Sequence, residues 1–267
     1  MKKILLILFS LSFLSLTKIS NAKSIRIGTE GAYPPWNNLN SAGELEGAEI
    51  DFGNEACARM AVDCEWVTQD WDGIIPALLQ GKYDIIIAGM SITEERKEKV
   101  NFTNGYMTDG AIFAVMKGSG LEGLSVAKFT GGVNKVNLNN AGGKEQAAIG
   151  QLIAAMSGAT VCVQSSTIHQ NFLEKHMSGA VKVRLYQSVD DHNLDLRAGR
   201  CDAVLADVGS IIDFMESGGG VNVAFTGPTF SGGVFGDGVG GAIRKEDGDI
   251  LKMWNKEIGR ASCRERV

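Results

Sequence analysis

The sequence predicts an α/β protein built around mostly parallel sheets, on three observations. Short apolar runs of strand length alternate with longer segments of helical apolar spacing. This alternation starts again after residues 121–158, a segment rich in Gly, Asn and Lys that we interpret as an insertion. Glycine-rich loops then separate the later elements. A repeated strand–helix–strand order is typical of parallel strands whose faces are covered by helices.

Each expected element follows from local pattern. Apolar runs bounded by turn residues predict strands at Ser24–Thr29, 64–68, 83–87, Ala111–Met116, 160–163, 181–186, 202–206 and 239–244. Helical spacing predicts helices at 50–60, 73–79, 145–156, 169–175, 190–198 and from Asp249 onward. Pro76 is acceptable in the first turn of its helix, where backbone N–H groups lack helical partners. The length fits one large domain or two lobes of roughly 100 residues each.

The two ends differ from the rest of the chain. Residues 1–22 combine Lys2 and Lys3 with an apolar stretch and a small-residue cleavage site, Ser20-Asn21-Ala22. This pattern predicts a secretory signal peptide and export to a bacterial periplasm. Residues 259–267 form a basic, patternless tail that we expect to be non-native, cutting the last helix short after Ile258.

Charge and cysteine content limit the function classes. The formal net charge is −5 without a basic stripe, which argues against nucleic acid and suits a cation or a zwitterion. Cys57 and Cys64 flank a helix-to-strand turn, and we expect a disulfide there. We expect Cys162 and Cys201 to be free buried thiols, with a second disulfide as the alternative. No cysteine spacing indicates zinc, and we expect no metal or cofactor.

The segment 84–96, reading DIIIAGMSITEER, is the most informative one. A buried strand ends in small residues, and Thr93 then predicts a capped helix start. Ligands of open α/β sheets bind beyond the carboxyl ends of strands. Backbone N–H groups, the Ser91 hydroxyl and the Arg96 guanidinium would together suit a carboxylate. The alternative is a plain strand–helix junction in which Arg96 pairs with Glu94 or Glu95.

Several stretches resemble a known family. They are IRIGTEGAYPPW, the run from Cys57 through Trp71 to Leu78, DIIIAGMS with SITEER, VQSST, DDHNLDLRAGRCDAVLAD and FGDGVGGAIRKED. In this order they cover almost all of residues 24–258. The chain resembles periplasmic solute-binding proteins of polar amino-acid ABC importers, bacterial solute-binding protein family 3. It is most similar to the lysine/arginine/ornithine, histidine and octopine/nopaline branch, whose disulfide matches the Cys57–Cys64 spacing.

The resemblance implies a bilobal type II periplasmic-binding fold with a ligand cleft between two mostly parallel sheets flanked by helices. Lobe 1 would comprise residues 23–113 and a truncated second part, 225–258, and lobe 2 residues 114–224. Strands near 112–116 and 223–227 would cross between the lobes, which close over the ligand by hinge motion.

The resemblance also implies ligand contacts. Arg96 would hold the α-carboxylate in a fork, assisted by Ser91, whose alternative is a local turn hydroxyl. Relatives carry serines where this chain has Ala88 and Gly89, so only backbone groups remain there. Asp207 would accept the α-ammonium group, or act as a helix N-cap. The remaining members of the implied site are Glu30, Tyr33, Trp71, Met90, Gln164, Thr167 and His169.

These remaining residues carry alternatives. Tyr33 and Trp71 would sandwich the aliphatic chain of the ligand, or pack in the core. Glu30 would meet a distal cationic group, or be a solvated loop charge. Thr167 would offer a backbone N–H. Gln164 would reach a second polar ligand group or satisfy a loop, and His169 would line the pocket or face solvent.

The expected function is delivery of a basic amino acid or a related opine to the membrane permease of an ABC importer. We expect a monomer that performs no chemistry and does not bind nucleic acid. The resemblance implies that Asp207 favours a primary α-amino group, because relatives that bind opines tend to carry a neutral amide there. The alternative is a periplasmic enzyme resembling cyclohexadienyl dehydratase, although no GxSxG nucleophile motif is present.

Overall fold

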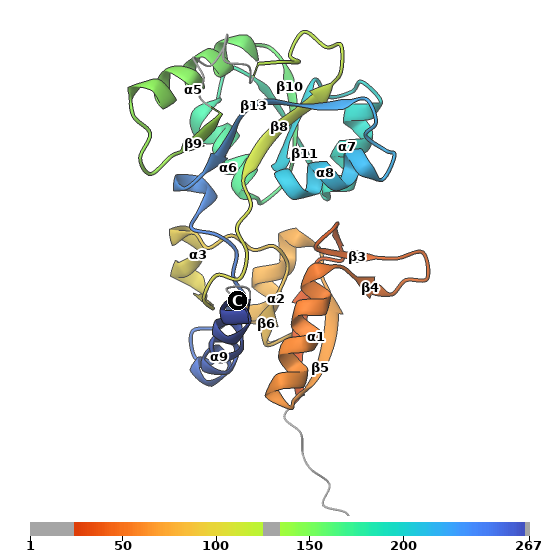
Figure 1. Cartoon of the computed structure of the whole chain (residues 1–267), viewed down its shortest axis with the longest axis vertical. Coiled ribbons are helices and arrows are strands. Elements are labelled where there is room, and N and C mark those ends of the chain that lie inside the picture. Colours follow the sequence, from red (N-terminus) through yellow and green to blue (C-terminus); the bar gives the residue numbers. More distant parts are fainter. Residues whose placement is uncertain (1–23, 125–133, 265–267) are drawn as a thin grey trace, which may run out of the picture.

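The computed structural model describes residues 24–124 and 134–264, with side chains described up to residue 259. The expected signal peptide lies outside the described residues. Two sheets form the centres of two lobes that are joined by extended connections (Figure 1). We use lobe 1 for the elements around the first sheet and lobe 2 for those around the second.

The sheet of lobe 1 has parallel strands at one side and antiparallel strands at the other. Its strands are β1 (Ser24–Thr29), β5 (Asp63–Thr68), β6 (Ile85–Ile86), β7 (Asn101–Phe102) and β14 (Ala242–Ile243). Their order is β5-β1-β6-β14-β7, with β1 parallel to β5 and β6. β14 comes from late in the chain and runs antiparallel to β6 and β7, so lobe 1 is discontinuous in sequence.

The sheet of lobe 2 has the order β11-β10-β12-β8-β13-β9. Its strands are β8 (Ala111–Met116), β9 (Lys135–Asn137), β10 (Thr160–Gln164), β11 (Lys182–Tyr186), β12 (Ala203–Asp207) and β13 (Val223–Ser231). β10 is parallel to β11 and β12, and β8 is antiparallel to β12 and β13. The expected α/β class with mostly parallel sheets is confirmed, with antiparallel strands where the chain enters and leaves lobe 2.

Helices and short turns surround these sheets. The helices are α1 (Ala48–Met60), α2 (Ile74–Leu79), α3 (Glu94–Lys99), α5 (Gly143–Ala155), α6 (Ile168–His176), α7 (Val189–Arg197), α8 (Val208–Glu216) and α9 (Gly248–Arg264). A small sheet of β2 (Ala32–Tyr33), β3 (Asn37–Leu39) and β4 (Leu45–Glu46) joins them, with 3-10 turns η1 (Trp71–Gly73) and η2 (Gly233–Phe235). The helix expected to stop after Ile258 continues to Arg264, which corrects that expectation.

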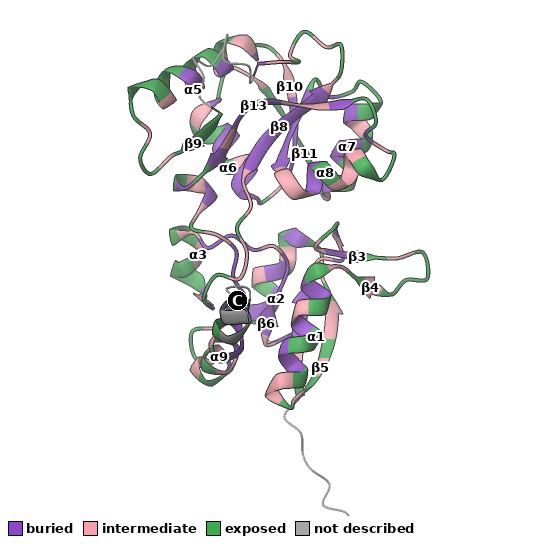
Figure 2. Ribbon diagram, viewed as in Figure 1, coloured by how far each residue is buried: buried purple, intermediate pink, exposed green. Residues whose placement is uncertain are grey.

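The central strands of both sheets are mostly buried (Figure 2). Because successive side chains of a strand point to opposite faces, Ile86 and its neighbour Ile85 enter different clusters. Ile86 packs with Leu78, whereas Ile85 packs with Trp254 of α9. Lobe 2 has its own core around aromatic residues that include Phe113 and Phe172.

The strands that were expected to cross between the lobes belong to lobe 2. β8 is a fully paired, buried central strand, and β13 pairs with it over residues 223–230. The chain therefore passes between the sheets outside these strands, at 103–110 and 232–241. The apolar pattern of Ala111–Met116 predicts a strand but does not say in which lobe it pairs.

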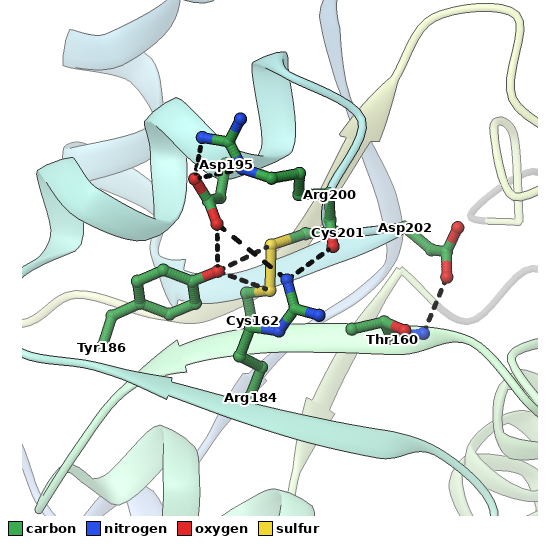
Figure 3. The surroundings of a disulfide bond; sticks show 8 residues. All are labelled: Thr160, Cys162, Arg184, Tyr186, Asp195, Arg200, Cys201 and Asp202. Carbon is green, nitrogen blue, oxygen red and sulfur yellow. Dashed lines mark hydrogen bonds and ion pairs between the residues drawn. A yellow bond between two sulfur atoms is a disulfide. The ribbon is translucent and has the colours of Figure 1, made fainter.

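Two disulfides close loops in the two lobes. Cys57 and Cys64 are bonded, as expected. Cys162 and Cys201 are bonded as well, with Cα atoms 5.9 Å apart, so the expectation of free thiols is wrong (Figure 3). β10 and β12 are neighbours in the sheet, and this pairing brings Cys162 close to Cys201, which lies two residues before β12.

Candidate functional site

A narrow cavity lies between the lobes at the carboxyl ends of the central strands. The walls contain every expected site residue except Met90, which is fully buried in a lobe 1 cluster. The lining comprises Glu30, Tyr33, Trp71, Ala88, Gly89, Ser91, Arg96, Gln164, Thr167, Ile168, His169, Val189, His192, Leu205, Ala206 and Asp207. Residues far apart in the sequence therefore meet at one place between the lobes.

Arg96 supplies the positive charge of the lobe 1 wall. Thr93 caps α3 by accepting from the Arg96 N–H, which sets Arg96 in the first turn. The Arg96 Nη1 donates to the Ser91 carbonyl at 2.9 Å, and the guanidinium lies 5.2 Å from the centroid of the Trp71 ring. Burial lowers the pKa of Arg96 to about 10, although the negative charges of Glu95 and Asp207 act to raise it.

Arg96 does not form the ion pair with Glu94 or Glu95 that was the alternative to a ligand contact. Among the described residues no carboxylate lies within ion-pair distance of its guanidinium, and Glu94 pairs with Lys97 instead. The charge is therefore held by carbonyl and ring contacts and faces a cavity that it shares with Asp207.

Asp207 supplies the negative charge of the lobe 2 wall, at the end of β12. It occupies the N-cap position of α8, but its carboxylate makes no capping hydrogen bond. It accepts instead from the Tyr33 hydroxyl of lobe 1, and it lies 3.3 Å from His169 Nε2. Burial opposes ionisation, yet the charge and hydrogen bond of His169, the Tyr33 hydroxyl and Arg96 hold the pKa of Asp207 below its usual value.

Glu30 and Gln164 form a second polar group in the cavity. The Gln164 Nε2 donates to Glu30 Oε1 at 2.6 Å across the lobes and to the Gln187 carbonyl at 2.9 Å. Burial raises the pKa of Glu30 to about 7, opposed by the Gln164 hydrogen bond and reinforced by Asp70, Asp190 and Asp72. A cation beside Glu30 would relieve this cost.

Tyr33 and Trp71 both contact the opposite lobe, and Trp71 also packs in a core cluster of lobe 1. Tyr33 is 8% and Trp71 is 9% exposed, and the Trp71 Nε1 donates to the Ser166 carbonyl of lobe 2 at 3.0 Å. Gly89, at a φ of 60°, backs the Tyr33 ring, where a Cβ would come within 2.7 Å of Tyr33 Cε1. A side chain at position 89 would displace this ring.

Contrary to the expectation, the Gly89 backbone N–H is not open to a ligand. Its N–H donates to the buried Glu49 carboxylate at 2.7 Å, so that donor is already used inside lobe 1. Glu49 also accepts from Tyr106 and Asn37, and it is 2% exposed. Thr167 uses its hydroxyl to cap α6 by accepting from Gln170 N–H at 3.2 Å.

Some cavity residues are absent from the sequence analysis. His192 is fully buried on α7, and Asp109 accepts from the N–H groups of Gly209 and Gly110 beside the cavity. Burial and the Asp207 charge raise the pKa of Asp109 to about 6. Burial and His169 lower the pKa of His192 to about 3. The apolar lining missed by sequence is Ile168, Val189, Leu205 and Ala206.

A sequence signal for His192 exists. Val189, His192 and Leu196 have the spacing of one helix face, and all three are buried in the structure. Spacing shows that His192 faces inward, but it cannot tell the core from a ligand cavity.

Neither a metal nor a membrane span is indicated by the described residues. In residues 24–124 and 134–264, no three His, Cys, Asp or Glu residues form a group that could hold a metal ion. Over the same ranges no helix has the length and apolar content that a bilayer crossing needs.

Comparisons with known proteins agree with this architecture. The octopine-binding periplasmic protein of Rhizobium meliloti is 40% identical over 84% of this chain and 74% of its own length. The L-arginine-binding protein of Pseudomonas aeruginosa is 37% identical over 97% of this chain and 90% of its own. A solved ancestral arginine-binding protein bound to arginine has a TM-score of 0.73 and 29% identity, covering 90% of this chain and 92% of that one.

These relatives are binding proteins, which confirms the expectation of a solute-binding role over an enzymatic one. The description "bacterial extracellular solute-binding proteins, family 3" matches residues 25–264, nearly the whole of the described chain. The chain belongs to the bacterial extracellular solute-binding proteins, family 3.

Proposed function

We propose that the cavity between the lobes captures a basic L-α-amino acid, arginine in the first place. The protein would act as a monomer in the periplasm and deliver this ligand to the membrane permease of an ABC importer. The names of two relatives, an octopine-binding and an L-arginine-binding protein, support a ligand that contains arginine or resembles it.

The observation that carries this proposal is the pair of opposite charges on facing walls. Arg96 of lobe 1 and Asp207 of lobe 2 line one cavity and are not bonded to each other. An α-amino acid carries a carboxylate and an ammonium group on one carbon. It can therefore satisfy both walls at once, with charge-assisted hydrogen bonds.

The rest of the cavity favours a positive side chain. Glu30 is half-buried, and its acidic neighbours Asp70, Asp72 and Asp190 add negative potential. Buried charges are stabilised when they are paired. A guanidinium or ammonium group at this place would pair with Glu30 in the position where Gln164 now donates.

A ligand panel tests the proposal. Purified protein would be melted with arginine, lysine, ornithine, histidine, octopine, glutamine and glutamate, and calorimetry would follow for ligands that raise Tm. A ligand that binds only the folded state stabilises it by RT ln(1 + [L]/Kd). Arginine should raise Tm most. A larger effect of glutamine or glutamate would contradict a basic ligand, and an effect of octopine alone would assign an opine.

A further inference from the structure

His192 is a polar side chain buried in the wall of the cavity without a use in the lobe 2 fold. It lies on the inner face of α7, is 0% exposed and lines the cavity together with Glu30 and Gln164. Neither Nδ1 nor Nε2 has a hydrogen-bond partner among the described residues. A buried polar group left unpaired costs about 1–3 kcal/mol, so such groups require an explanation.

Packing holds α7 and therefore the imidazole in place. Ser188 caps the helix by accepting from Asp191 N–H at 3.2 Å, and the Tyr186 ring lies 6.3 Å from the His192 ring. Tyr186 also donates to Asp195 near the other end of the helix, beside the Cys162–Cys201 bond (Figure 3). The ring is thus presented to the cavity by a rigid support.

Surrounding charges indicate which ligand group fits. The carboxylates of Glu30 and Asp207 line the same cavity and favour N–H donors over a second carboxylate. Burial and the nearby His169 lower the pKa of His192, and the Asn193 side chain acts in the opposite direction. A neutral imidazole has one nitrogen that accepts a hydrogen bond and one that donates.

We propose that His192 is a ligand-binding residue whose imidazole accepts a hydrogen bond from a nitrogen-bearing group of the ligand side chain. This inference rests on the proposed function, because it names a contact of the same amino-acid ligand. It adds a lobe 2 contact for the side chain to the lobe 1 contact from Glu30. A ligand with an apolar side chain would leave His192 unpaired, so the residue selects against such ligands.

Calorimetry with arginine and octopine tests this contact on two variants of His192, with His176→Leu and Arg96→Ala as references. His192→Leu removes the hydrogen bond and should weaken arginine binding about tenfold or more, since hydrogen bonds to charged groups contribute about 1.5–3 kcal/mol. His192→Gln keeps an acceptor and should lose about threefold or less. His176→Leu, on α6 and outside the cavity, is the matched control and should leave affinity unchanged.

The outcomes separate this inference from the proposed function. Octopine shares the guanidinium of arginine and adds a carboxylate, so an equal loss for both ligands in His192→Leu supports the inference. A loss for octopine alone would overturn it, because the imidazole would then contact the added carboxylate. Unchanged arginine affinity in His192→Leu would also overturn the inference. If Arg96→Ala weakened arginine binding in the same experiment, the proposed function would still stand. Unchanged affinity in both variants would reject the proposed site itself.

Discussion

The two walls of the cavity hold their charges in different ways. On lobe 1, Arg96 rests on the Ser91 carbonyl and the Trp71 ring, and no carboxylate within the described residues pairs with it. On lobe 2, Asp207 is already bonded to Tyr33 and lies beside His169. In the proposed function, Arg96 would therefore meet the ligand without giving up an ion pair. Asp207 would exchange a bond that joins the lobes for a bond to the ligand.

This difference shows what ligand capture has to replace. Other contacts between the lobes are Gln164 with Glu30, Trp71 with Ser166 and the Ser165 hydroxyl with Asp72 at 2.9 Å. The bonds of Tyr33 and Gln164 end on carboxylates that a ligand would also use. We therefore expect removal of the lobe 1 charge to affect binding more than neutralisation of the lobe 2 charge. The following predictions test this ranking.

The largest effect is expected for Arg96→Ala. Truncating one partner of a buried, hydrogen-bonded charge pair costs about 2–5 kcal/mol, so arginine affinity should fall roughly thirtyfold to several thousandfold. Calorimetry measures the loss, and circular dichroism checks that the variant is folded. Lys97→Ala, one residue further on and paired with exposed Glu94, should bind normally. Near wild-type affinity of Arg96→Ala would exclude a carboxylate at this wall.

The two disulfides, one in each lobe, differ in how much they are expected to stabilise the folded protein. Cys162–Cys201 spans a sequence separation of 39, against 7 for Cys57–Cys64. Loop-closure entropy then predicts a contribution of about 4 kcal/mol for the longer loop and about 2 kcal/mol for the shorter. Replacing both cysteines of the lobe 2 pair with Ser should therefore lower Tm more than the same change in lobe 1. The reverse order in scanning calorimetry would show that strain or residual structure outweighs loop length.

Asp207→Asn tests the lobe 2 wall directly. The amide can still accept from Tyr33 but no longer attracts an ammonium group, and we expect a loss of about 1.5–3 kcal/mol in arginine binding. Asp213→Asn, on the same helix α8 and half-buried, is the matched control. If Asp207→Asn were as damaging as Arg96→Ala, the proposed inequality between the walls would be wrong.

The smallest effect concerns Glu30 and pH. Burial raises the pKa of Glu30 to about 7 in the ligand-free protein, so at pH 6 the carboxyl is mostly protonated. A cationic ligand requires the charged form, and binding then releases a proton. Affinity for arginine should consequently be about tenfold higher at pH 8 than at pH 6.

The same shift has the opposite sign for the stability of the ligand-free protein. The folded state holds the Glu30 proton more tightly than the unfolded chain, so the contribution of Glu30 to the free energy of unfolding falls as pH rises from 4.5 to about 7.

Glu30→Gln should flatten the pH dependence of arginine binding and weaken the binding of arginine far more than that of glutamine. A slope that persists in Glu30→Gln would point to Asp109, whose pKa is raised to about 6.

Much of the fold was predictable because its signals are local. The strand Ser24–Thr29 has the bounds expected from its apolar pattern, and Thr93 caps α3 as its position before Glu94 indicates. Arg96 follows from this cap, since a side chain in the first turn of a helix after a strand lies at the sheet edge. The site residues Tyr33, Trp71 and Asp207 came from resemblance, not from spacing.

The sequence by itself determined the strand–helix order, the short-range disulfide Cys57–Cys64 and the charged residues at strand ends. Each depends on neighbours within a few residues, where propensity, capping and periodicity operate. Tertiary structure alone decided that Cys162 meets Cys201, that the Gly89 N–H is used by Glu49 and that His192 faces a cavity rather than a core. These depend on which strands become neighbours and on how two lobes close, and such long-range packing leaves no local pattern.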